Sequence, residues 1–388
     1  MSLPSESQTL PPLSLYIHVP WCIRKCPYCD FNSHQAGSDI PEAAYIAALL
    51  SDLDQDLHWV QGRSIQSIFF GGGTPSLLSA EAYGQLFTGL KARLNFADDI
   101  EITLEANPGT FEAEKFAAYR QTGINRLSVG IQSFQPEHLK ALGRVHDREQ
   151  ALRAIEMIRS SGFDNFNLDL MHGLPGQTEE QALDDLKTAL SFEPPHLSWY
   201  QLTIEPNTEF YKYPPKLPEE ETLWEIQDAG HALLEAAGYQ HYEISAYSQP
   251  GRQARHNVNY WQFGDYLGIG AGAHGKVTTL GPQGLTILRT WKTRLPKDYL
   301  NPDKAFLAGS EKIGGEDAGL ECLMNALRLN QGITVADFEA RTGTTLEMVS
   351  TQVKLARQKG LLEAEGDLRA TPLGRQYLNE LLAMFLDD

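Results

Sequence analysis

Three cysteines, Cys22, Cys26 and Cys29, lie within one eight-residue stretch and have the spacing Cys-x3-Cys-x2-Cys. Soft thiolate ligands select zinc, copper(I) or an iron–sulfur cluster. A structural zinc ion needs a fourth protein ligand, and the one remaining cysteine, Cys322, is 293 residues beyond Cys29. A [4Fe–4S] cluster is usually held by four cysteines, so three would leave one iron open to a small molecule. The spacing therefore predicts a metal centre, with a structural zinc site as the alternative.

A run of three glycines, Gly71-Gly72-Gly73-Thr74-Pro75, separates a predicted strand from a predicted helix. Consecutive glycines let the backbone approach a ligand closely, and bare N–H groups can bind a carboxylate or a phosphate. The run lacks the Gly-Lys-Ser/Thr ending of a phosphate-binding loop, which argues against a nucleoside triphosphate. It is interpreted as a ligand loop or as a plain turn.

Polar side chains stand at the ends of predicted strands. Glu105, Gln132 and Asp169 could bind ribose hydroxyls or an amino group there, or could simply cap helices and hydrogen-bond loops. Arg144 follows the fourth strand, where it could pair with a carboxylate or be a solvated surface charge.

An imidazole lies close to two aromatic residues in His256-Asn257-Val258-Asn259-Tyr260-Trp261. Histidine is a common axial ligand of haem iron, and aromatic faces pack well on a porphyrin. The alternative is an ordinary hydrogen-bonded histidine in a loop. Further on, the glycine-rich residues 270–275 match a dinucleotide-binding pattern, but a β-like segment follows where that pattern needs a helix, so we interpret them as a tight turn near the site.

The elements that must position these residues alternate along the first 238 residues. Six strands, each followed by a helix, predict a parallel sheet whose carboxyl ends carry the site, in an α/β fold of partial (β/α)6 barrel type. The predicted strands are 13–19, 67–70, 101–105, 126–131, 165–171 and 197–204. The predicted helices are 42–60, 80–94, 112–122, 148–160, 179–190 and 219–237.

Beyond residue 238 the alternation stops. The segments 242–247, 257–261, 276–280 and 285–290 read as β structure, which predicts a small β extension packed on the barrel over residues 239–310. Residues 311–388 read as two helices, 332–338 and 345–359, and a strand, 361–368, which is typical of a winged helix. That region carries 13 acidic and 8 basic side chains, so we expect an interaction module rather than a DNA-binding one. The expected regions are a polar tail at 1–12, the barrel at 13–238, the extension and the winged-helix-like domain.

Composition narrows the class of protein. The chain has 388 residues, 42% hydrophobic and 21% charged, with a net charge of −18. That charge argues against nonspecific nucleic-acid binding. No apolar run approaches the ~20 residues that span a bilayer, and no signal peptide precedes the first strand. We therefore expect a cytoplasmic protein, in which clustered thiols are metal ligands rather than disulfides.

Taken together, these motifs resemble the radical S-adenosylmethionine superfamily, and the residues Tyr16 to Cys22 with the glycine run resemble its branch related to oxygen-independent coproporphyrinogen III oxidase. Within that branch the chain is most similar to the haem-chaperone group. The resemblance covers nearly the whole chain and implies that the three cysteines hold a [4Fe–4S] cluster whose open iron is chelated by S-adenosylmethionine. The residues that it implies around S-adenosylmethionine are Tyr16, Tyr28, Gly72, Gly73, Thr74, Glu105, Gln132, Arg144 and Asp169. Those that it implies around haem are His256, Asn257, Tyr260 and Trp261.

Two departures separate this chain from the oxidase. The oxidase motif has a further cysteine two residues after the third, where this chain has Phe31, and its N-terminal segment is longer. The resemblance thus implies a haem chaperone that hands haem to other proteins, membrane respiratory proteins among them, with a cluster-dependent homodimer left open. The alternative is a radical enzyme that acts on a tetrapyrrole.

Overall fold

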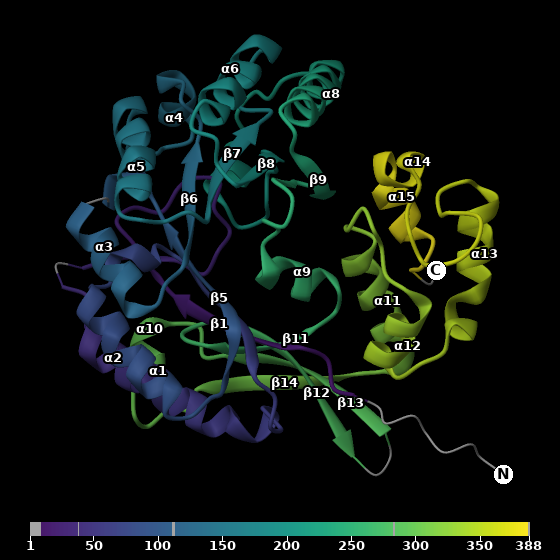
Figure 1. Ribbon diagram of the computed structural model, residues 1–388, viewed down its shortest axis with the longest axis horizontal. Coiled ribbons are helices and arrows are strands. Elements are labelled where there is room, and N and C mark those ends of the chain that lie inside the picture. Colours follow the sequence, from purple (N-terminus) through teal and green to yellow (C-terminus); the bar gives the residue numbers. More distant parts are fainter. Residues whose placement is uncertain (1–8, 38, 111–112, 282–283, 387–388) are drawn as a thin grey trace.

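One large open sheet organises the chain (Figure 1). In the computed structural model, which describes residues 9–37, 39–110, 113–281 and 284–386, the strands follow the order β14-β13-β12-β11-β1-β4-β5-β6-β7-β8-β10-β9. They are β1 (Leu13–Val19), β4 (Ile65–Gly72), β5 (Phe96–Ala106), β6 (Arg126–Gln132), β7 (Phe166–His172), β8 (His196–Gln201), β9 (Gln240–Glu243), β10 (Ala246–Ser248), β11 (Asp265–Ile269), β12 (His274–Gly281), β13 (Gly284–Lys292) and β14 (Leu307–Ile313). A separate small sheet pairs β2 (Trp21–Cys22) with β3 (His34–Gln35).

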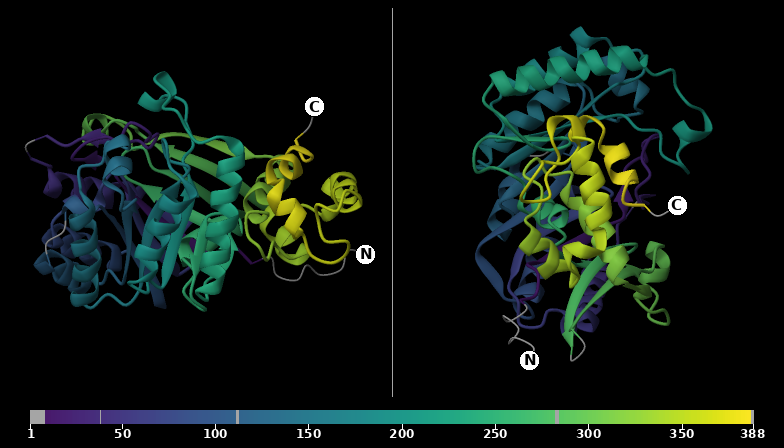
Figure 2. Two further views of the ribbon diagram at one scale, coloured as in Figure 1. Left: turned by 90° about the horizontal axis from the view of Figure 1, so that it is seen from above. Right: turned by 90° about the vertical axis from the view of Figure 1, so that its right-hand side faces the viewer.

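The parallel strands and the helices between them confirm the predicted α/β fold with its six βα units. Strands β1 and β4 to β8 pair in parallel. The long helices lie on the outside of the sheet (Figures 1 and 2). They are α1 (Glu42–Asp56), α2 (Ala80–Lys91), α3 (Ala113–Thr122), α5 (Arg148–Ser160), α6 (Glu179–Leu190) and α8 (Glu220–Ala236), with the shorter α4 (Pro136–Ala141), α7 (Glu209–Lys212) and α10 (Pro296–Tyr299). Single turns of 3₁₀ helix occur at Leu57–Trp59, Pro75–Leu77, Pro108–Thr110 and Leu346–Val349.

The two faces of the sheet differ in polarity. Successive side chains of a strand point to opposite faces. On β1, Leu13, Leu15 and Ile17 belong to the apolar core beneath the helices. The alternate positions on β1 and its neighbours carry Ser14, Tyr16, His18, Ser67, Glu105, Ser128, Asp169, Ser198 and Tyr200. The face away from the helices is therefore polar, and it is there that a ligand can be bound.

The β segments after residue 238 do not form one body packed on the barrel, and that part of the prediction is wrong. Instead they extend the same sheet at both edges. Strands β9 and β10 join beside β8, whereas β11, which the sequence did not reveal, pairs in parallel with β1 and leads into the antiparallel strands β12 to β14. The predicted bend between β12 and β13 includes residues 282–283, which lie outside the described residues.

The predicted β segment at 257–261 is also wrong, because the chain there forms the helix α9 (Arg255–Trp261). The backbone N–H groups of Arg255 and His256 both donate to Glu101 Oε1, at 2.9 and 3.4 Å. A carboxylate at this point satisfies donors at the first turn and complements the helix dipole. Because this carboxylate comes from β5, no residue near α9 in the sequence indicates that a helix begins there.

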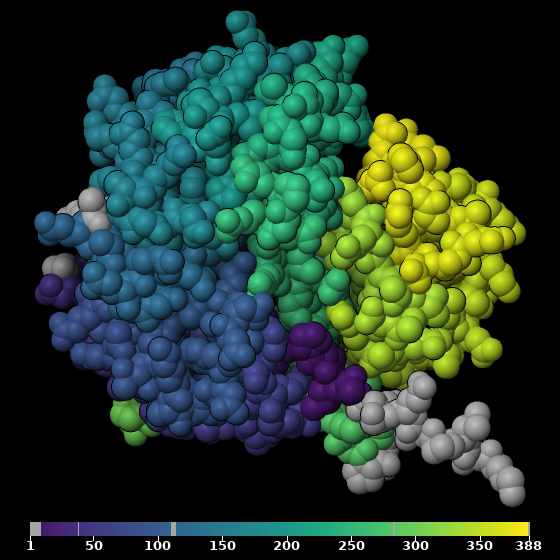
Figure 3. Space-filling view, in the orientation of Figure 1, coloured from purple at the N-terminus to yellow at the C-terminus, as the bar shows by residue number. Residues whose placement is uncertain are grey.

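The C-terminal lobe packs beside the segments that follow β8 (Figure 3). It consists of α11 (Gly315–Ala326), α12 (Val335–Thr342), α13 (Ser350–Gln358), α14 (Pro372–Gln376) and α15 (Leu378–Ala383) around its own apolar cluster, which includes Cys322 and Phe338. The predicted strand at 361–368 is reduced to isolated bridges, Ile333 to Leu368 and Leu362 to Ala370.

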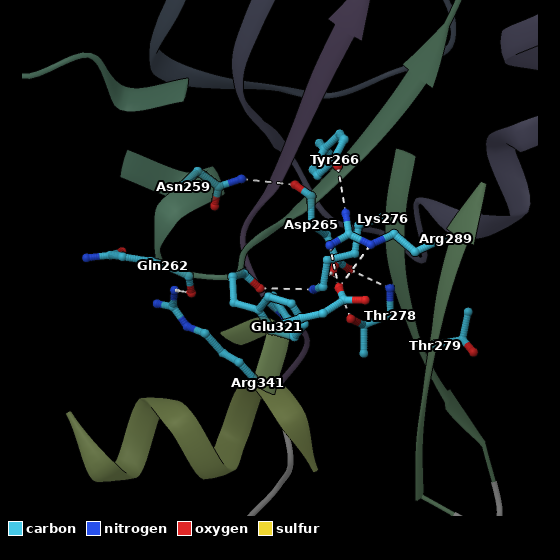
Figure 4. A network of polar contacts seen from close by, with 12 residues as sticks. Asn259, Gln262, Asp265, Tyr266, Lys276, Thr278, Thr279, Arg289, Glu321 and Arg341 are labelled. Carbon is cyan, nitrogen blue, oxygen red and sulfur yellow. Dashed lines mark hydrogen bonds and ion pairs between the residues drawn. The ribbon is translucent and has the colours of Figure 1, made fainter. Parts of the chain in front are cut away.

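Ion pairs fasten the extension to the barrel and the lobe to the extension (Figure 4). Asp265 on β11 binds Lys276 Nζ at 2.9 Å and Arg63 Nη1 at 2.7 Å. Arg289 Nε on β13 donates to Glu321 of α11 at 3.1 Å, and its Nη1 donates to the Tyr266 hydroxyl at 3.0 Å. No described helix has the length and apolar character needed to cross a membrane.

Candidate functional site

The three cysteines of residues 22–29 (the cysteine loop) line one cavity of about 350 Å³ at the carboxyl ends of the parallel strands. The loop connects β2 with β3 and is held at several points along its backbone. Cys29 N donates to Cys26 O at 3.1 Å, and Phe210 N of α7 donates to Pro27 O at 3.0 Å. All three cysteines are half-buried and none of them forms a disulfide, so each sulfur is available as a ligand.

Hydrogen-bond donors point at two of the three sulfur atoms. Thr74 Oγ1 donates to Cys22 Sγ at 3.7 Å, and Arg144 Nη1 donates to Cys26 Sγ at 3.5 Å. Asn107 joins these donors, because it accepts from Arg144 Nη2 and donates to Thr74 Oγ1 at 3.0 Å. Such donors stabilise sulfur in its anionic form. Asn107 was missed from the sequence, although it stands just after a predicted strand end, as Glu105 does.

Burial raises the pKa values of the Cys22 and Cys29 thiols, so the ligand-free loop holds these two as thiols rather than thiolates. Among the described residues, no three His, Cys, Asp or Glu side chains already form a group that could hold a metal ion. The cysteine loop nevertheless fits a soft metal centre by its donor set, since three thiols share one cavity and receive hydrogen bonds at sulfur.

The glycine run lies against the cysteine loop, but its N–H groups are not bare. Gly72 N donates to Glu105 Oε2 at 3.2 Å, Gly73 N to Val19 O at 2.7 Å and Thr74 N to Trp21 O at 2.7 Å. These amides are therefore already engaged in this structure, and the interpretation of the run as a ligand loop stays a prediction. Glycine is required at residue 72 because its φ is +110° and a Cβ there would lie 2.3 Å from the His18 ring.

The strand-end residues predicted from the sequence converge on the same cavity. Tyr28, Gly72, Gly73, Thr74, Glu105, Gln132, Arg144 and Asp169 all line it together with the three cysteines. Gln132 holds a φ of +70°, which is uncommon for a residue other than glycine. Its Oε1 accepts from the Tyr200 hydroxyl at 2.9 Å, which fixes the amide at the cavity wall.

Two buried carboxyl groups, those of Glu105 and Asp169, face this cavity, and neither belongs to the ion pairs found among the described residues. Burial, with a further contribution from nearby Asp169, raises the pKa of Glu105 to about 8. Burial likewise raises the pKa of Asp169, although Asn167 Nδ2 at 2.7 Å and Ser128 Oγ at 3.1 Å donate to it. The pair can accept hydrogen bonds from hydroxyl or amino groups of a bound molecule. Arg144 is not a solvated surface charge, since it is enclosed among Cys26, Asn107 and Gly130.

A second cavity, of about 650 Å³, adjoins the cysteine cavity. The structure brings together there all four residues of the motif that begins at His256, namely His256, Asn257, Tyr260 and Trp261. Tyr16 lines this second cavity and not the cysteine cavity, whereas Gly72 and Glu105, which are also expected around S-adenosylmethionine, line both. The volume of the second cavity lies in the range that holds ligands of cofactor size.

His256 is held by a ring contact and a hydrogen bond, and it is neutral. Its ring stacks on Phe69, with centroids 5.0 Å apart, and its Nδ1 lies 3.3 Å from Ser67 Oγ. Burial, reinforced by Arg126, lowers the pKa of His256 to about 4. A neutral imidazole whose Nδ1 is engaged by a hydroxyl can offer Nε2 to a metal.

The two cavities share a boundary. Phe31, Gly72 and Glu105 line both of them. The side chain of Phe31 is 58% exposed, so an apolar ring stands open to solvent at the junction. The next residue, Asn32, ties this junction to the glycine turn, since its Nδ2 donates to Ala271 O at 3.0 Å and a Cβ at Gly272 would lie 2.1 Å from that nitrogen. The prediction of a tight turn near the site is thereby confirmed.

Other singled-out residues serve the fold or the cavity rim. His18 and His274 line the second cavity, whereas His172 packs against Trp199 with centroids 4.2 Å apart. Cys322 is fully buried in the C-terminal lobe, as its apolar surroundings on a helix predicted.

Comparison with known proteins agrees with this geometry. The sequence pattern of the Radical SAM superfamily matches residues 16–189, and that of the HemN C-terminal domain matches residues 314–377. The solved structure described as coproporphyrinogen III oxidase (HemN) from Escherichia coli, a radical SAM enzyme, superposes with a TM-score of 0.81 over 98% of this chain and 91% of that chain. At 23% identity, this likeness concerns the fold alone. The fold and the cysteine site define a protein of the radical S-adenosylmethionine class.

Whole-length relatives specify the class further. The chain is 51% identical to Heme chaperone HemW of Escherichia coli (strain K12), over 97% of this chain and 99% of that protein. It is 52% identical to Heme chaperone HemW of Haemophilus influenzae over 98% of this chain and 99% of that protein. It is 34% identical to Heme chaperone HemW of Bacillus subtilis, again over 97% of this chain and 99% of that protein. The chain belongs to the heme chaperone HemW family.

Proposed function

We propose that this protein binds haem in the second cavity and transfers it to haem proteins. The observation that carries the proposal is His256, a neutral imidazole that lines a cavity of about 650 Å³ between the aromatic side chains of Tyr260 and Trp261 on one helix and Tyr16 and Phe69 on the sheet. A neutral histidine is a suitable axial ligand for haem iron, and the apolar rings suit the faces of a porphyrin.

We propose further that Cys22, Cys26 and Cys29 hold a [4Fe–4S] cluster and that S-adenosylmethionine occupies the rest of the cysteine cavity. The donors at Cys22 and Cys26 and the paired carboxyls of Glu105 and Asp169 support both assignments. When bound, the cluster and S-adenosylmethionine supply one-electron chemistry, and this chain's own residues orient them and limit access of water. Because Glu105 and Phe31 border both cavities, occupancy of one can influence the other.

The partners follow from the same assignment. Haem is the cargo, and the acceptors are haem proteins, with membrane respiratory proteins among them. The net charge of −18 disfavours nucleic acid as a partner. A cytoplasmic location fits the three reduced thiols, and a homodimer that depends on the cluster is part of the proposal to be tested by measuring mass in solution before and after cluster loading.

The experiment that tests haem binding is a titration of anaerobically purified, cluster-loaded protein with haem, followed by its Soret absorbance. Wild type should form a stable complex that loads an apo-haemoprotein. His256→Ala should shift the Soret band and weaken binding. His231→Ala is the matched control, since His231 is a half-buried helical histidine on α8 that lines neither cavity. Failure of wild type to bind haem would refute the proposal.

A second candidate function is a radical enzyme that acts on a tetrapyrrole. The contiguity of the two cavities favours it, because Gly72 and Glu105 border both the cysteine cavity and the larger one. Phe31 in place of the further cysteine of the oxidase argues against decarboxylation of coproporphyrinogen. An anaerobic assay with a reductant distinguishes the candidates, since the enzyme would form 5′-deoxyadenosine and a changed porphyrin only when the tetrapyrrole is present.

A further inference from the structure

The second cavity is lined by an arginine, Arg294, whose charge has no ion-pair partner among the described residues. Of the described residues that line it, Lys292 and Arg294 are the two with a lysine or arginine side chain. Lys292 is 1% exposed and already paired with two carboxylates, Asp52 at 2.6 Å and Asp56 at 2.7 Å. The charge of Lys292 is therefore already compensated by these two carboxylates. Arg294 is exposed and forms none of the ion pairs found among the described residues, so its charge is available.

Arg294 is nevertheless held in place. Its Nε donates to Asn32 Oδ1 at 3.1 Å, and Asn32 Nδ2 donates back to the Arg294 carbonyl at 2.9 Å. Asn32 is itself fixed by the Ala271 carbonyl at 3.0 Å. The two terminal nitrogens of the guanidinium remain free of these contacts. A guanidinium whose position is set before binding loses little freedom when it captures a planar carboxylate.

His256 and Arg294 line the second cavity from different parts of the sheet. His256 stacks over Phe69 on β4, next to β1, whereas Arg294 follows the end of β13. Strands β1, β11 and β12 lie between β4 and β13, so about 19 Å of sheet separates the strand under His256 from the strand that leads to Arg294. A flat ligand with a metal ion at its centre and carboxylates on one edge would meet the imidazole with its centre and the guanidinium with that edge.

Two acidic residues also line this cavity, and neither neutralises Arg294. Asp30 is exposed at the rim beside the cysteine loop. Glu105 lies at the boundary with the cysteine cavity, and its carboxyl is mostly protonated at pH 7 because its pKa is raised to about 8. In a chain with a net charge of −18, a dianionic ligand needs such a local cation.

We propose that Arg294 is the propionate-binding residue of the second cavity and sets the orientation in which haem is bound. The inference rests on the proposed haem binding. It adds a subsite that binds the carboxylate edge of the porphyrin rather than its iron.

The test compares haem with haem dimethyl ester, whose propionates carry no charge, in Soret titrations of the full-length, cluster-loaded protein. Wild type should bind haem more tightly than the diester, and Arg294→Gln should reduce this preference by about 3- to 10-fold, the range expected of a partly exposed charged contact. Arg294→Lys should retain part of the preference. Raising the salt concentration should reduce the preference of wild type for haem over the diester.

Arg255→Gln is the matched control. It removes the same charge from a residue adjacent to His256, but Arg255 is paired with Asp99 at 2.6 Å and does not line the cavity. The preference of Arg255→Gln for haem over the diester should equal that of wild type. Thermal unfolding of each variant shows whether the fold is intact. If wild type binds neither porphyrin, haem binding itself is refuted; if wild type binds both equally, or folded Arg294→Gln keeps the full preference, the propionate subsite is refuted.

Discussion

The imidazole of His256 stacks on the ring of Phe69, with centroids 5.0 Å apart and planes inclined by 25°. Helix α9 thereby presents its single histidine to the second cavity, against a strand 187 residues earlier in the chain. Phe69→Leu should weaken haem binding by about 2- to 10-fold, because an aromatic pair contributes ~0.5–1.5 kcal/mol beyond area burial. The Soret titration measures this effect. Phe192→Leu, a half-buried aromatic at the end of α6, should leave haem affinity unchanged.

The hydroxyl of Thr74 should tune the metal centre. Thr74 Oγ1 donates to Cys22 Sγ at 3.7 Å, and donors at sulfur stabilise the more negative, reduced form of a cluster. Thr74→Val should therefore shift the midpoint reduction potential of the loaded cluster to a more negative value, as redox titration would show. Thr103→Val is the same change at a buried residue of β5 that does not line the cysteine cavity, and it should leave the potential unchanged. Equal potentials in wild type and Thr74→Val would contradict the assignment.

Local signals decided which elements could be predicted from the sequence. Helices α5 and α6 agree with the prediction to the residue, because each begins at a capping box that is visible in the sequence, Asp147 with Gln150 and Thr178 with Gln181. The opposite holds for α9, whose first turn is capped by Glu101 from another strand. Strand β11 has five residues, all buried, and gives no alternation by which it could be recognised.

The candidate site, like the fold, could be predicted from the sequence only in part. Residue type and spacing identified the three cysteines, and strand ends identified Glu105, Gln132 and Asp169. The partition into two cavities depends instead on which face of β1 turns inward and on how α9 packs over β4. It therefore could not be predicted, and neither could the position of Tyr16 beside the second cavity.

The backbone of Gln132 should reveal its strain through two substitutions. Both Gln132→Ala and Gln132→Gly lose the contact with Tyr200 at 2.9 Å, but only glycine adopts a φ of +70° freely. The glycine variant should therefore be the more stable of the two by about 1 kcal/mol in the free energy of unfolding. Both should bind S-adenosylmethionine more weakly than wild type in equilibrium dialysis. At Gln85, exposed on helix α2, the order should reverse, since glycine destabilises a helix.

Asp265 should be critical for stability. It is fully buried and accepts from Arg63, Lys276 and Thr278, so Asp265→Asn leaves Lys276 charged and without its partner in the interior. We expect a loss of about 3–5 kcal/mol in urea unfolding. Asp54→Asn breaks an ion pair of similar length, to Arg93 at 2.6 Å, but at the surface. It should cost at most about 1 kcal/mol, and a similar loss in both variants would contradict the argument from burial.

The carboxyl of Glu105 should make stability fall as pH rises from about 5 to 8. Burial, together with Asp169, raises its pKa from 4.5 to about 8, so the folded protein holds this proton more tightly than the unfolded chain does. The stabilisation is therefore complete below the unfolded pKa and is lost as pH rises through the folded one. Because Glu105→Gln cannot ionise, the stability of this variant relative to wild type should increase across that window, as unfolding midpoints measured at several pH values would show. Glu149 is an exposed residue of α5, and the difference in stability between Glu149→Gln and wild type should not increase with pH. A difference between Glu105→Gln and wild type that stays constant with pH would mean that Glu105 ionises in the folded protein as it does in water.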